Sequence, residues 1–352
     1  MKINNRPIGS DHATYIIAEV GLAHDGSLGA AHAFVDAAAK VGVDAIKFQT
    51  HIPAEESSPF EQFRVNVFPQ DATRYQYWQR TSFTRDQWLK LADYTRSQGL
   101  DFLSSPFSAL AVEWLDDCGV TAWKIASGEV TNYPMLRQMA ATGKPLLISS
   151  GMSDWAELDR TIEFVRTLKT KDGANCEFGI FQCTTAYPCP AEKWGLNIIT
   201  EMLNRYQCAV GLSDHSGTIF PSLASRMLGA SMLEFHVVFD HGQFGPDTKA
   251  SLTFEQTDQL VRGIRSIETA TQNPIDKDAQ AATLVETRKL FAKSLYAARD
   301  LEPGHTLTDQ DILIRKPLIG VSAADYDSTI GKKLTTAVAK DQPIEPKNLS
   351  TS

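Results

Sequence analysis

The sequence predicts an α/β protein in which a (β/α)8 TIM barrel precedes a small C-terminal domain of short strands and 3₁₀ turns. Its 352 residues suffice for a barrel of about 250 residues and one further small module. Short apolar runs alternate with longer helical patterns through most of the chain. This alternation is typical of parallel strands joined by crossover helices. The last part of the chain lacks the alternation.

The apolar runs, rich in β-branched residues, are the expected strands, at residues 15–20, 44–49, 101–105, 122–125, 145–149, 178–184, 208–212 and 232–236. The amphipathic segments between them are the expected helices, at residues 29–41, 84–98, 108–118, 133–142, 154–168, 195–205, 218–228 and 254–269. Eight strand–helix repeats favour closure into a barrel over an open sheet.

We expect three segments along the chain. Residues 1–272 form the barrel, which is the catalytic domain. Residues 273–286 turn polar and form a linker, and residues 287–352 form the small domain. A long aromatic-rich insertion at residues 51–80 follows the second strand. An insertion of that length on the catalytic face of a barrel is typical of a lid, and a surface insertion with its own small core is the alternative.

Composition and charge exclude several classes of protein. The net charge of −8 argues against a nucleic-acid surface, which needs a basic stripe. The N-terminus has no signal-peptide pattern, and no stretch approaches the roughly 20 apolar residues of a membrane helix. The five cysteines have no paired short spacing and are expected to be reduced thiols. We therefore expect a cytoplasmic protein that binds neither nucleic acid nor membrane.

Charged and polar residues recur at the carboxyl end of nearly every predicted strand. The active site of such a barrel lies at these ends. Lys, Glu, Asp and His are rarely buried without partners, so their recurrence here predicts a catalytic site. The residues at or just beyond the strand ends include Glu19, Lys47, Gln49, Ser105, Lys124, Ser127, Glu129, Ser149, Asp214, His215, Glu234, His236 and Asp247.

His215 and His236 come from consecutive predicted strands, the seventh and the eighth. Neighbouring strands lie about 4.8 Å apart, so the two imidazoles can converge on one divalent metal ion. Two hydrogen-bonded core histidines are the alternative. The presence of Asp214 and Glu234 beside them favours the metal.

Lys47 and Lys124 allow two interpretations. One is a Schiff-base aldolase, in which a desolvated lysine is the nucleophile. The other is a cradle for a phosphate and a carboxylate. Ser127 and Ser150 are each followed by glycine. Glycine allows backbone N–H groups to approach an anion closely, which favours the cradle.

A set of short motifs resembles the N-acetylneuraminate (sialic acid) synthase family. They are Ile-Ala-Glu-Val-Gly at 17–21, Lys-Phe-Gln at 47–49, Ser-Pro-Phe at 105–107, Lys-Ile-Ala-Ser-Gly-Glu at 124–129, Ser-Ser-Gly-Met at 149–152, Cys-Thr-Thr-Ala-Tyr-Pro at 183–188, Gly-Leu-Ser-Asp-His-Ser at 211–216 and Gly-Pro-Asp at 245–247. Each motif alone is weak, but the ordered set is specific. The tail resembles the family's antifreeze-like (SAF) domain.

The resemblance implies a transferase that condenses phosphoenolpyruvate with an N-acetylmannosamine-like sugar to give a nine-carbon 2-keto acid and phosphate. It implies that His215 and His236 hold Mn²⁺ or Mg²⁺. It makes Glu19 and Asp247 the acidic groups near the sugar, and it makes both lysines catalytic. The implied substrate contacts are Gln49, Ser105, Ser127, Glu129, Ser149, Thr185, Tyr187, Ser213 and Lys316. It further implies a homodimer in which the tail of one chain closes the barrel of the other.

Three departures from the family pattern concern the sugar. The sequence has Ala-His-Asp-Gly at 23–26 where the family usually has Asn-His-x-Gly, and Thr185 where some members have Asn. Lys316, beside Arg315, stands where those members have a sugar-contacting Arg. Lys and Arg are not interchangeable in such a contact. Legionaminic and pseudaminic acid synthases, which use a diacetylated dideoxy hexose, are therefore alternatives. A Schiff-base aldolase, a synthase for shorter keto acids and a non-catalytic carbohydrate-binding protein are the others.

Overall fold

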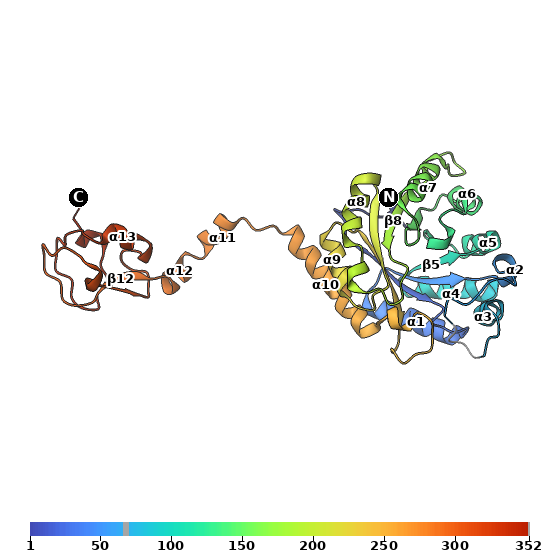
Figure 1. Cartoon of the computed structure of the whole chain (residues 1–352), viewed down its shortest axis with the longest axis horizontal. Helices are drawn as coiled ribbons and strands as arrows, with labels where there is room; N and C mark the ends of the chain where they lie inside the picture. Colours follow the sequence, from blue (N-terminus) through green and yellow to red (C-terminus); the bar gives the residue numbers. More distant parts are fainter. Residues whose placement is uncertain (66–69, 351–352) are drawn as a thin grey trace. The chain divides into compact units, whose positions relative to one another are not determined.

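The computed structural model describes residues 1–65 and 70–350. The chain divides into two compact units, Met1–Gln272 and Asn273–Ser352. Figure 1 shows strands enclosed by helices in the first unit and short elements in the second. Among the described residues, no helix is both long enough and apolar enough to cross a membrane.

The larger unit is a nearly closed barrel of parallel strands. Its strands are β3 (Tyr15–Gly21), β4 (Ala45–Thr50), β5 (Asp101–Pro106), β6 (Trp123–Ile125), β7 (Leu146–Ser149), β8 (Phe178–Cys183), β9 (Ala209–Asp214) and β10 (Met232–Val238). They pair in the order β5-β4-β3-β10-β9-β8-β7-β6. The two ends of this path, β5 and β6, pack against each other and complete the ring. The predicted barrel is confirmed.

Helices form the outer layer of the barrel (Figure 1). They are α1 (Leu28–Val41), α4 (Arg85–Ser97), α5 (Ala109–Asp117), α6 (Tyr133–Ala141), α7 (Trp155–Thr167), α8 (Leu196–Tyr206), α9 (Phe220–Met227) and α10 (Phe254–Gln272). Helices α1, α4, α5, α6 and α7 each begin after a Ser, Thr, Asn or Asp whose side chain accepts a backbone N–H. Such caps satisfy otherwise unpaired donors and fix where each helix starts.

The inward-facing side chains change character along each strand. On β3, Tyr15 and Ile17 pack inside the lower barrel with Met232 of β10. Side chains on one face of a strand recur every second residue, so the next inward positions are Glu19 on β3 and Glu234 on β10. The barrel is therefore sealed by an apolar layer below and lined by charged groups above.

Two additions cover the ends of the barrel. An antiparallel pair, β1 (Lys2–Ile3) and β2 (Arg6–Pro7), lies below, where Ile3 joins the inner apolar layer. Above, the insertion forms α2 (Pro53–Glu56) and α3 (Arg74–Thr81). Tyr77 and Trp78 of α3 pack on Leu22, which follows β3. The insertion thus has a small apolar cluster that is attached to the barrel mouth.

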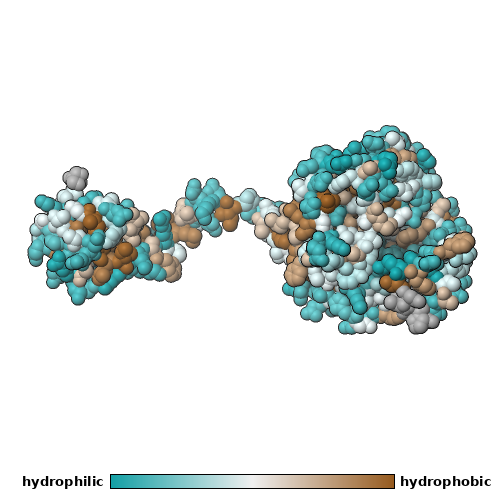
Figure 2. Space-filling view, in the orientation of Figure 1, coloured by the Kyte–Doolittle hydropathy of each residue, from teal (hydrophilic) through white to brown (hydrophobic). Residues whose placement is uncertain are grey.

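The smaller unit is built from short elements. They are α11 (Lys277–Thr283), α12 (Val285–Phe291), β12 (Ser294–Ala297), β13 (Ile312–Arg315), α13 (Tyr326–Thr329) and three 3₁₀ turns at Asp309–Asp311, Ala323–Asp325 and Pro346–Asn348. Strands β12 and β13 are antiparallel. Helix α11 lies inside the segment expected as a linker. Its flanking residues include exposed Leu284 and Val285, and hydrophobic patches are visible along this segment in Figure 2.

Candidate active site

Two connected cavities open at the carboxyl ends of the barrel strands. The deeper cavity, of about 70 Å³, is lined by Glu19, Lys47, Gln49, Ser105, Lys124, Ala126, Ser127, Ser149, Cys183, Tyr187, Ser213, His215, Glu234 and His236. The outer cavity, of about 220 Å³, shares three of these residues, Gln49, Tyr187 and His236. The two cavities are therefore adjacent.

Two lysines and two glutamates form a buried ion network in the deeper cavity. Lys47 Nζ lies 2.7 Å from Glu19 Oε2 and 3.8 Å from Glu234 Oε2. Lys124 Nζ lies 3.1 Å from Glu234 Oε1, which also accepts a hydrogen bond from Ser213 Oγ at 3.1 Å. All four charged side chains are at most 6% exposed. Burial of so many charges is tolerable only because each has a partner of opposite sign.

The network keeps Lys47 protonated. Burial alone would lower the pKa of Lys47, but the carboxylates of Glu19 and Glu234 outweigh burial and raise it. Burial also opposes ionisation of Glu234, yet Lys124 and Lys47 together lower the pKa of Glu234 to about 2. A Schiff-base nucleophile needs a neutral amine. The geometry therefore suits an anion-binding cation rather than a nucleophilic lysine.

Hydroxyl groups complete the lower wall of this cavity. Lys47 Nζ donates to Ser105 Oγ at 3.3 Å, and Lys124 Nζ donates to Ser149 Oγ at 2.6 Å. Ser127 Oγ accepts from the backbone N–H of Gly151 at 3.2 Å. A Cβ at Gly151 would lie only 2.7 Å from Ser127 Oγ. These lysines and serines form the candidate anion cradle, and the cradle therefore requires glycine at position 151.

His215 and His236 face each other beside the network, with ring centroids 5.5 Å apart. The Nδ1 of His215 lies 2.9 Å from the carbonyl oxygen of Thr184, which can only accept a hydrogen bond. Nδ1 of His215 therefore carries the hydrogen, and Nε2 keeps its lone pair. Burial, with a smaller contribution from the charge of His236, lowers the pKa of His215 to about 4. Neutral imidazole is the form that binds metal ions.

This pair fits a divalent cation that takes its other ligands from water and substrate. Within residues 1–65 and 70–350, no group of three His, Cys, Asp or Glu side chains is arranged to hold a metal ion. Asp214 does not line the deeper cavity, where the two imidazoles lie. Its carboxylate accepts from Ser216 N at 2.8 Å and from Ser222 Oγ at 3.2 Å, so its role is to shape the loop after β9.

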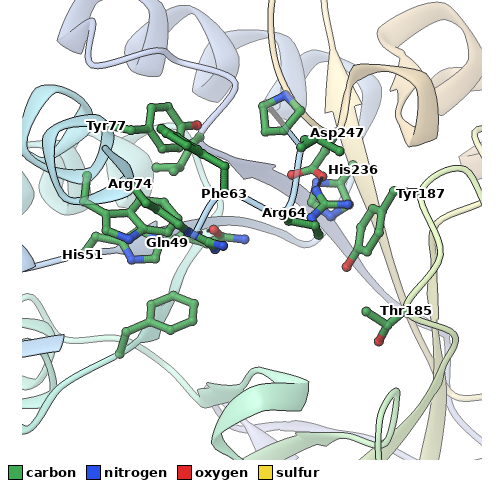
Figure 3. A pocket seen from close by; sticks show the side chains of 15 residues that line it. Gln49, His51, Phe63, Arg64, Arg74, Tyr77, Thr185, Tyr187, His236 and Asp247 are labelled. Atoms are coloured by element: carbon green, nitrogen blue, oxygen red, sulfur yellow. Dashed lines mark hydrogen bonds and ion pairs between the residues drawn. The ribbon is translucent and has the colours of Figure 1, made fainter. Parts of the chain in front are cut away.

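The outer cavity is bordered by the insertion and by the loops after β8 and β10. Arg64 Nη2 lies 2.6 Å from Asp247 Oδ1, and its guanidinium lies 4.4 Å from the centroid of the Tyr187 ring. Figure 3 shows these three side chains facing one another beside His236. On the opposite side, His51 is stacked between two aromatic rings, with centroid distances of 3.8 Å to Trp78 and 4.3 Å to Phe107.

The structure brings most of the predicted site residues together. Of the predicted set, Thr185 and Asp247 line only the outer cavity. Glu129 lines neither of the two cavities; it lies in a 3₁₀ turn, Ser127–Glu129, and accepts a hydrogen bond from Asn132 Nδ2 at 2.8 Å. Lys316 belongs to the smaller unit, where its Nζ lies 5.2 Å from the centroid of the Phe291 ring.

Sequence reasoning missed Arg64, His51 and Phe107 as residues of the outer cavity. His51 directly follows the second strand, and Phe107 directly follows the third. Their positions after strands could have identified them. Nothing in the sequence around Arg64 indicates that its side chain reaches Asp247, because that contact depends on the path of the insertion.

Family models match both units of the chain. The NeuB family model matches residues 34–276, and the SAF domain model matches residues 292–350. The chain belongs to the NeuB family. The resemblance inferred from the sequence motifs is thereby confirmed.

Full-length relatives support this membership. The chain is 31% identical to N,N'-diacetyllegionaminic acid synthase of Legionella pneumophila, over 95% of this chain and 94% of that protein. It is 31% identical to human N-acetylneuraminate-9-phosphate synthase, over 96% of this chain and 93% of that protein. A similar solved structure is that of an N-acetylneuraminic acid synthetase from Leptospira borgpetersenii in complex with citrate. It has a TM-score of 0.70 and 25% identity, and the match covers 82% of this NeuB-family chain and 95% of that one.

Proposed function

We propose that this NeuB-family chain is a transferase that condenses phosphoenolpyruvate with an N-acetylmannosamine-like amino sugar, giving a nine-carbon 2-keto acid and phosphate. The observation that carries the proposal is the junction of two unlike cavities. The deeper one contains Lys47 and Lys124 with several hydroxyls, which suits a small anion. The outer one is larger and mostly apolar, which suits a sugar.

Phosphoenolpyruvate fits the deeper cavity by charge. Its phosphate and carboxylate need cations and hydrogen-bond donors, and the buried lysines supply both. The hydroxyls of Ser105, Ser127 and Ser149 lie within the same wall. We propose that Lys47 and Lys124 exchange part of their contact with the glutamates for contact with the ligand. Lys47 remains charged throughout, so it binds rather than attacks.

The reaction balances with one added water. The enol carbon of phosphoenolpyruvate attacks the aldehyde carbon of the open-chain sugar, and the aldehyde oxygen takes up a proton. Water then adds to the carbon that bears the phosphate, and phosphate leaves with cleavage of the C–O bond. His215 and His236 would hold a divalent ion, Mn²⁺ or Mg²⁺, which supplies Lewis-acid polarisation of the sugar carbonyl when bound.

We propose that Glu19 moves a proton at the sugar oxygen. Its Oε1 accepts from Gln49 Nε2 at 3.0 Å, and Gln49 lines both cavities. The carboxylate therefore lies at the boundary where the two substrates would meet. Asp247 borders the outer cavity and is proposed as the second acidic group that contacts the sugar. General acid–base groups need this hydrogen-bond proximity to the reacting oxygen.

We further propose a homodimer that works in the cytoplasm, with the small domain, including Lys316, over the partner's barrel. The support is the SAF domain match at residues 292–350 and the small hydrophobic core of that unit. All five cysteines are free thiols, which is compatible with a reducing compartment. Light scattering that gave the mass of one chain at micromolar concentration would contradict the dimer.

Phosphate release from phosphoenolpyruvate tests the function. The assay contains Mn²⁺ and one of four sugars: N-acetylmannosamine, either of two diacetylated dideoxy hexoses, or arabinose 5-phosphate. Release with an amino sugar, abolished by a chelator, is the expected result and distinguishes the alternatives that make legionaminic or pseudaminic acid. Covalent trapping of pyruvate on a lysine by borohydride, without phosphate release, would instead identify a Schiff-base aldolase.

A further inference from the structure

The chemistry of the outer cavity restricts the sugar that it can accept. Its lining is dominated by apolar and aromatic side chains, namely Leu22, Phe63, Val65, Tyr77, Trp78, Phe107, Tyr187 and Pro246. Burial of apolar ligand groups against such walls is favourable by about 25 cal/mol per Å². Acyl methyl groups on a sugar would gain from this contact, whereas a phosphate would lose its hydration there.

Both arginines of this lining already have a carboxylate partner, and so does His51. Arg64 is paired with Asp247 at 2.6 Å, and Arg74 Nε lies 3.1 Å from Glu61 Oε1. His51 Nδ1 lies 2.5 Å from a carboxylate oxygen of Glu56. A phosphate dianion in this cavity would therefore have to compete with three resident carboxylates. The lysines of the deeper cavity are also paired with carboxylates, but there the hydroxyls of Ser105, Ser127 and Ser149 lie in the same wall and add donors for an anion.

We propose that the outer cavity selects an uncharged, N-acylated amino sugar over a sugar phosphate, and that Arg64 is the residue that sets this selectivity. The inference rests on the proposed function and specifies its sugar. Asp247 neutralises the Arg64 guanidinium, so the pair offers hydrogen-bond donors without net charge. An amide carbonyl of an acyl group can accept from such a donor, but a dianion gains no net attraction from the neutral pair.

The surroundings of Arg64 hold its guanidinium in one place. The guanidinium lies over the ring of Tyr187, and its ion pair with Asp247 fixes its orientation. Tyr187 and Asp247 belong to loops of the barrel, whereas Arg64 belongs to the insertion. The guanidinium has more donors than one carboxylate uses, and its side chain is 41% exposed, so donors remain for a ligand.

The first test compares sugars on the full-length enzyme with Mn²⁺. We expect kcat/KM for N-acetylmannosamine or a diacetylated hexose to exceed that for N-acetylmannosamine 6-phosphate by at least about tenfold. The fastest phosphate release with the 6-phosphate would overturn this inference and leave the proposed function intact. No release with any sugar would overturn both.

The second test assigns the selectivity to Arg64. In Arg64→Ala, we expect KM for the uncharged sugar to rise about 10-fold to 100-fold, the range for a lost charged hydrogen-bond donor. KM for phosphoenolpyruvate should change less than about twofold, because Arg64 does not line the deeper cavity. A purely structural role would instead raise both KM values together. The matched control is Arg85→Ala, which removes an exposed arginine paired with Asp117.

The third test uses Asp247→Asn, which leaves the Arg64 charge without its partner. The ratio of kcat/KM for the 6-phosphate to kcat/KM for the uncharged sugar should rise at least about fivefold, because a free guanidinium attracts phosphate. Taking the ratio cancels any loss of catalysis that the two sugars share. The double variant Arg64→Ala/Asp247→Asn should lose this rise. An unchanged ratio in Asp247→Asn, or the same rise in the double variant, would overturn the role of Arg64.

Discussion

Lys47 on β4 and Glu19 on β3 are paired residues in the β3–β4 register, and their side chains meet 2.7 Å apart inside the barrel. Parallel neighbouring strands place such residues side by side, so the ion pair is fixed by sheet geometry rather than by mobile loops. Gln49, two residues further on β4, donates to the same carboxylate. The pair thus forms a rigid wall of the deeper cavity.

The substitution Lys47→Met should lower kcat/KM for phosphoenolpyruvate at least about 100-fold. It removes a fixed cation from the proposed anion cradle, and loss of one such electrostatic contact commonly has this effect. It also leaves Glu19 without its nearest countercharge. Steady-state phosphate release against phosphoenolpyruvate concentration gives the value. The control Lys144→Met removes a surface lysine paired with Asp116 and should change kcat/KM less than about twofold.

Removal of the metal ion and substitution of either histidine should both cause a large loss of activity. His215→Ala and His236→Ala should each lose bound Mn²⁺ and at least about 100-fold in activity, while circular dichroism stays unchanged. His12→Ala, at an exposed position, is the matched control. Metal content after dialysis is measured by elemental analysis. Full activity in the double variant, in the presence of a chelator, would contradict the metal assignment.

The alternation of strands and helices could be predicted from the sequence because each barrel strand is buried on both faces. Such strands form continuous apolar runs, and each predicted run overlaps one observed strand, from Tyr15–Gly21 to Met232–Val238. The switch to charged residues at the upper inward positions indicated which end of the barrel contains the candidate site. Short elements could not be predicted this way. Strand β11 (Leu252–Thr253) has two residues, and its pairing with β10 depends on tertiary contact.

The outer cavity was less predictable than the deeper one. The deeper cavity is built by strand ends, whose spacing follows from the sheet. The outer cavity depends on how the insertion folds back, so the contacts of Arg64 and Trp78 have no local signal. Glu129 shows what the position of a residue after a strand leaves open. It lies in the 3₁₀ turn that follows the strand, where its carboxylate accepts a hydrogen bond from Asn132, and this contact could not be predicted from the sequence.

Gly151→Ala should raise KM for phosphoenolpyruvate at least about tenfold. The added methyl would lie 2.6 Å from Thr185 Oγ1, 2.7 Å from Ser127 Oγ and 2.9 Å from Cys183 Sγ. These are short side chains that cannot move aside without leaving the cradle. Overpacking of this kind also costs about 1–3 kcal/mol of stability, which thermal denaturation would detect.

Gly29→Ala is the control for that substitution. Gly29 lies near the start of α1, where a Cβ would meet only Ser27 Oγ at 3.9 Å. Because alanine favours helix, this variant should be unchanged or more stable by up to about 1 kcal/mol. An unchanged KM in Gly151→Ala would show that the serine cradle does not bind the phosphate or carboxylate.

The small domain should lose stability in acid through Asp311. This carboxylate is fully buried and accepts from Arg299, His305 and Thr308, including Arg299 Nη2 at 2.7 Å and His305 Nε2 at 2.9 Å. Burial opposes ionisation, but the hydrogen bonds from His305, Thr308 and Arg299 outweigh it and hold the pKa of Asp311 well below its usual range. The ionised form is therefore the form that stabilises the fold.

A carboxyl with a depressed folded pKa contributes fully above its unfolded pKa, near 3.9, and loses that contribution as pH falls towards the folded value. We expect Asp311→Asn to lower the free energy of unfolding of the small domain at pH 7 by about 2 kcal/mol. The difference from wild type should shrink progressively below about pH 4. Denaturant unfolding of the full-length chain at pH 7 and at pH 3, followed by hydrogen exchange in residues 293–350, measures both values.

The matched control is Asp341→Asn. Asp341 pairs with Arg315 at 2.6 Å, but both side chains are about half exposed, so the pair is screened by solvent. Its backbone is left-handed, with φ of 66°, a conformation that asparagine also accepts. This variant should match wild type within about 0.5 kcal/mol at both pH values. A pH-independent loss in Asp311→Asn would mean that shape, and not the charge of Asp311, is what the small domain requires.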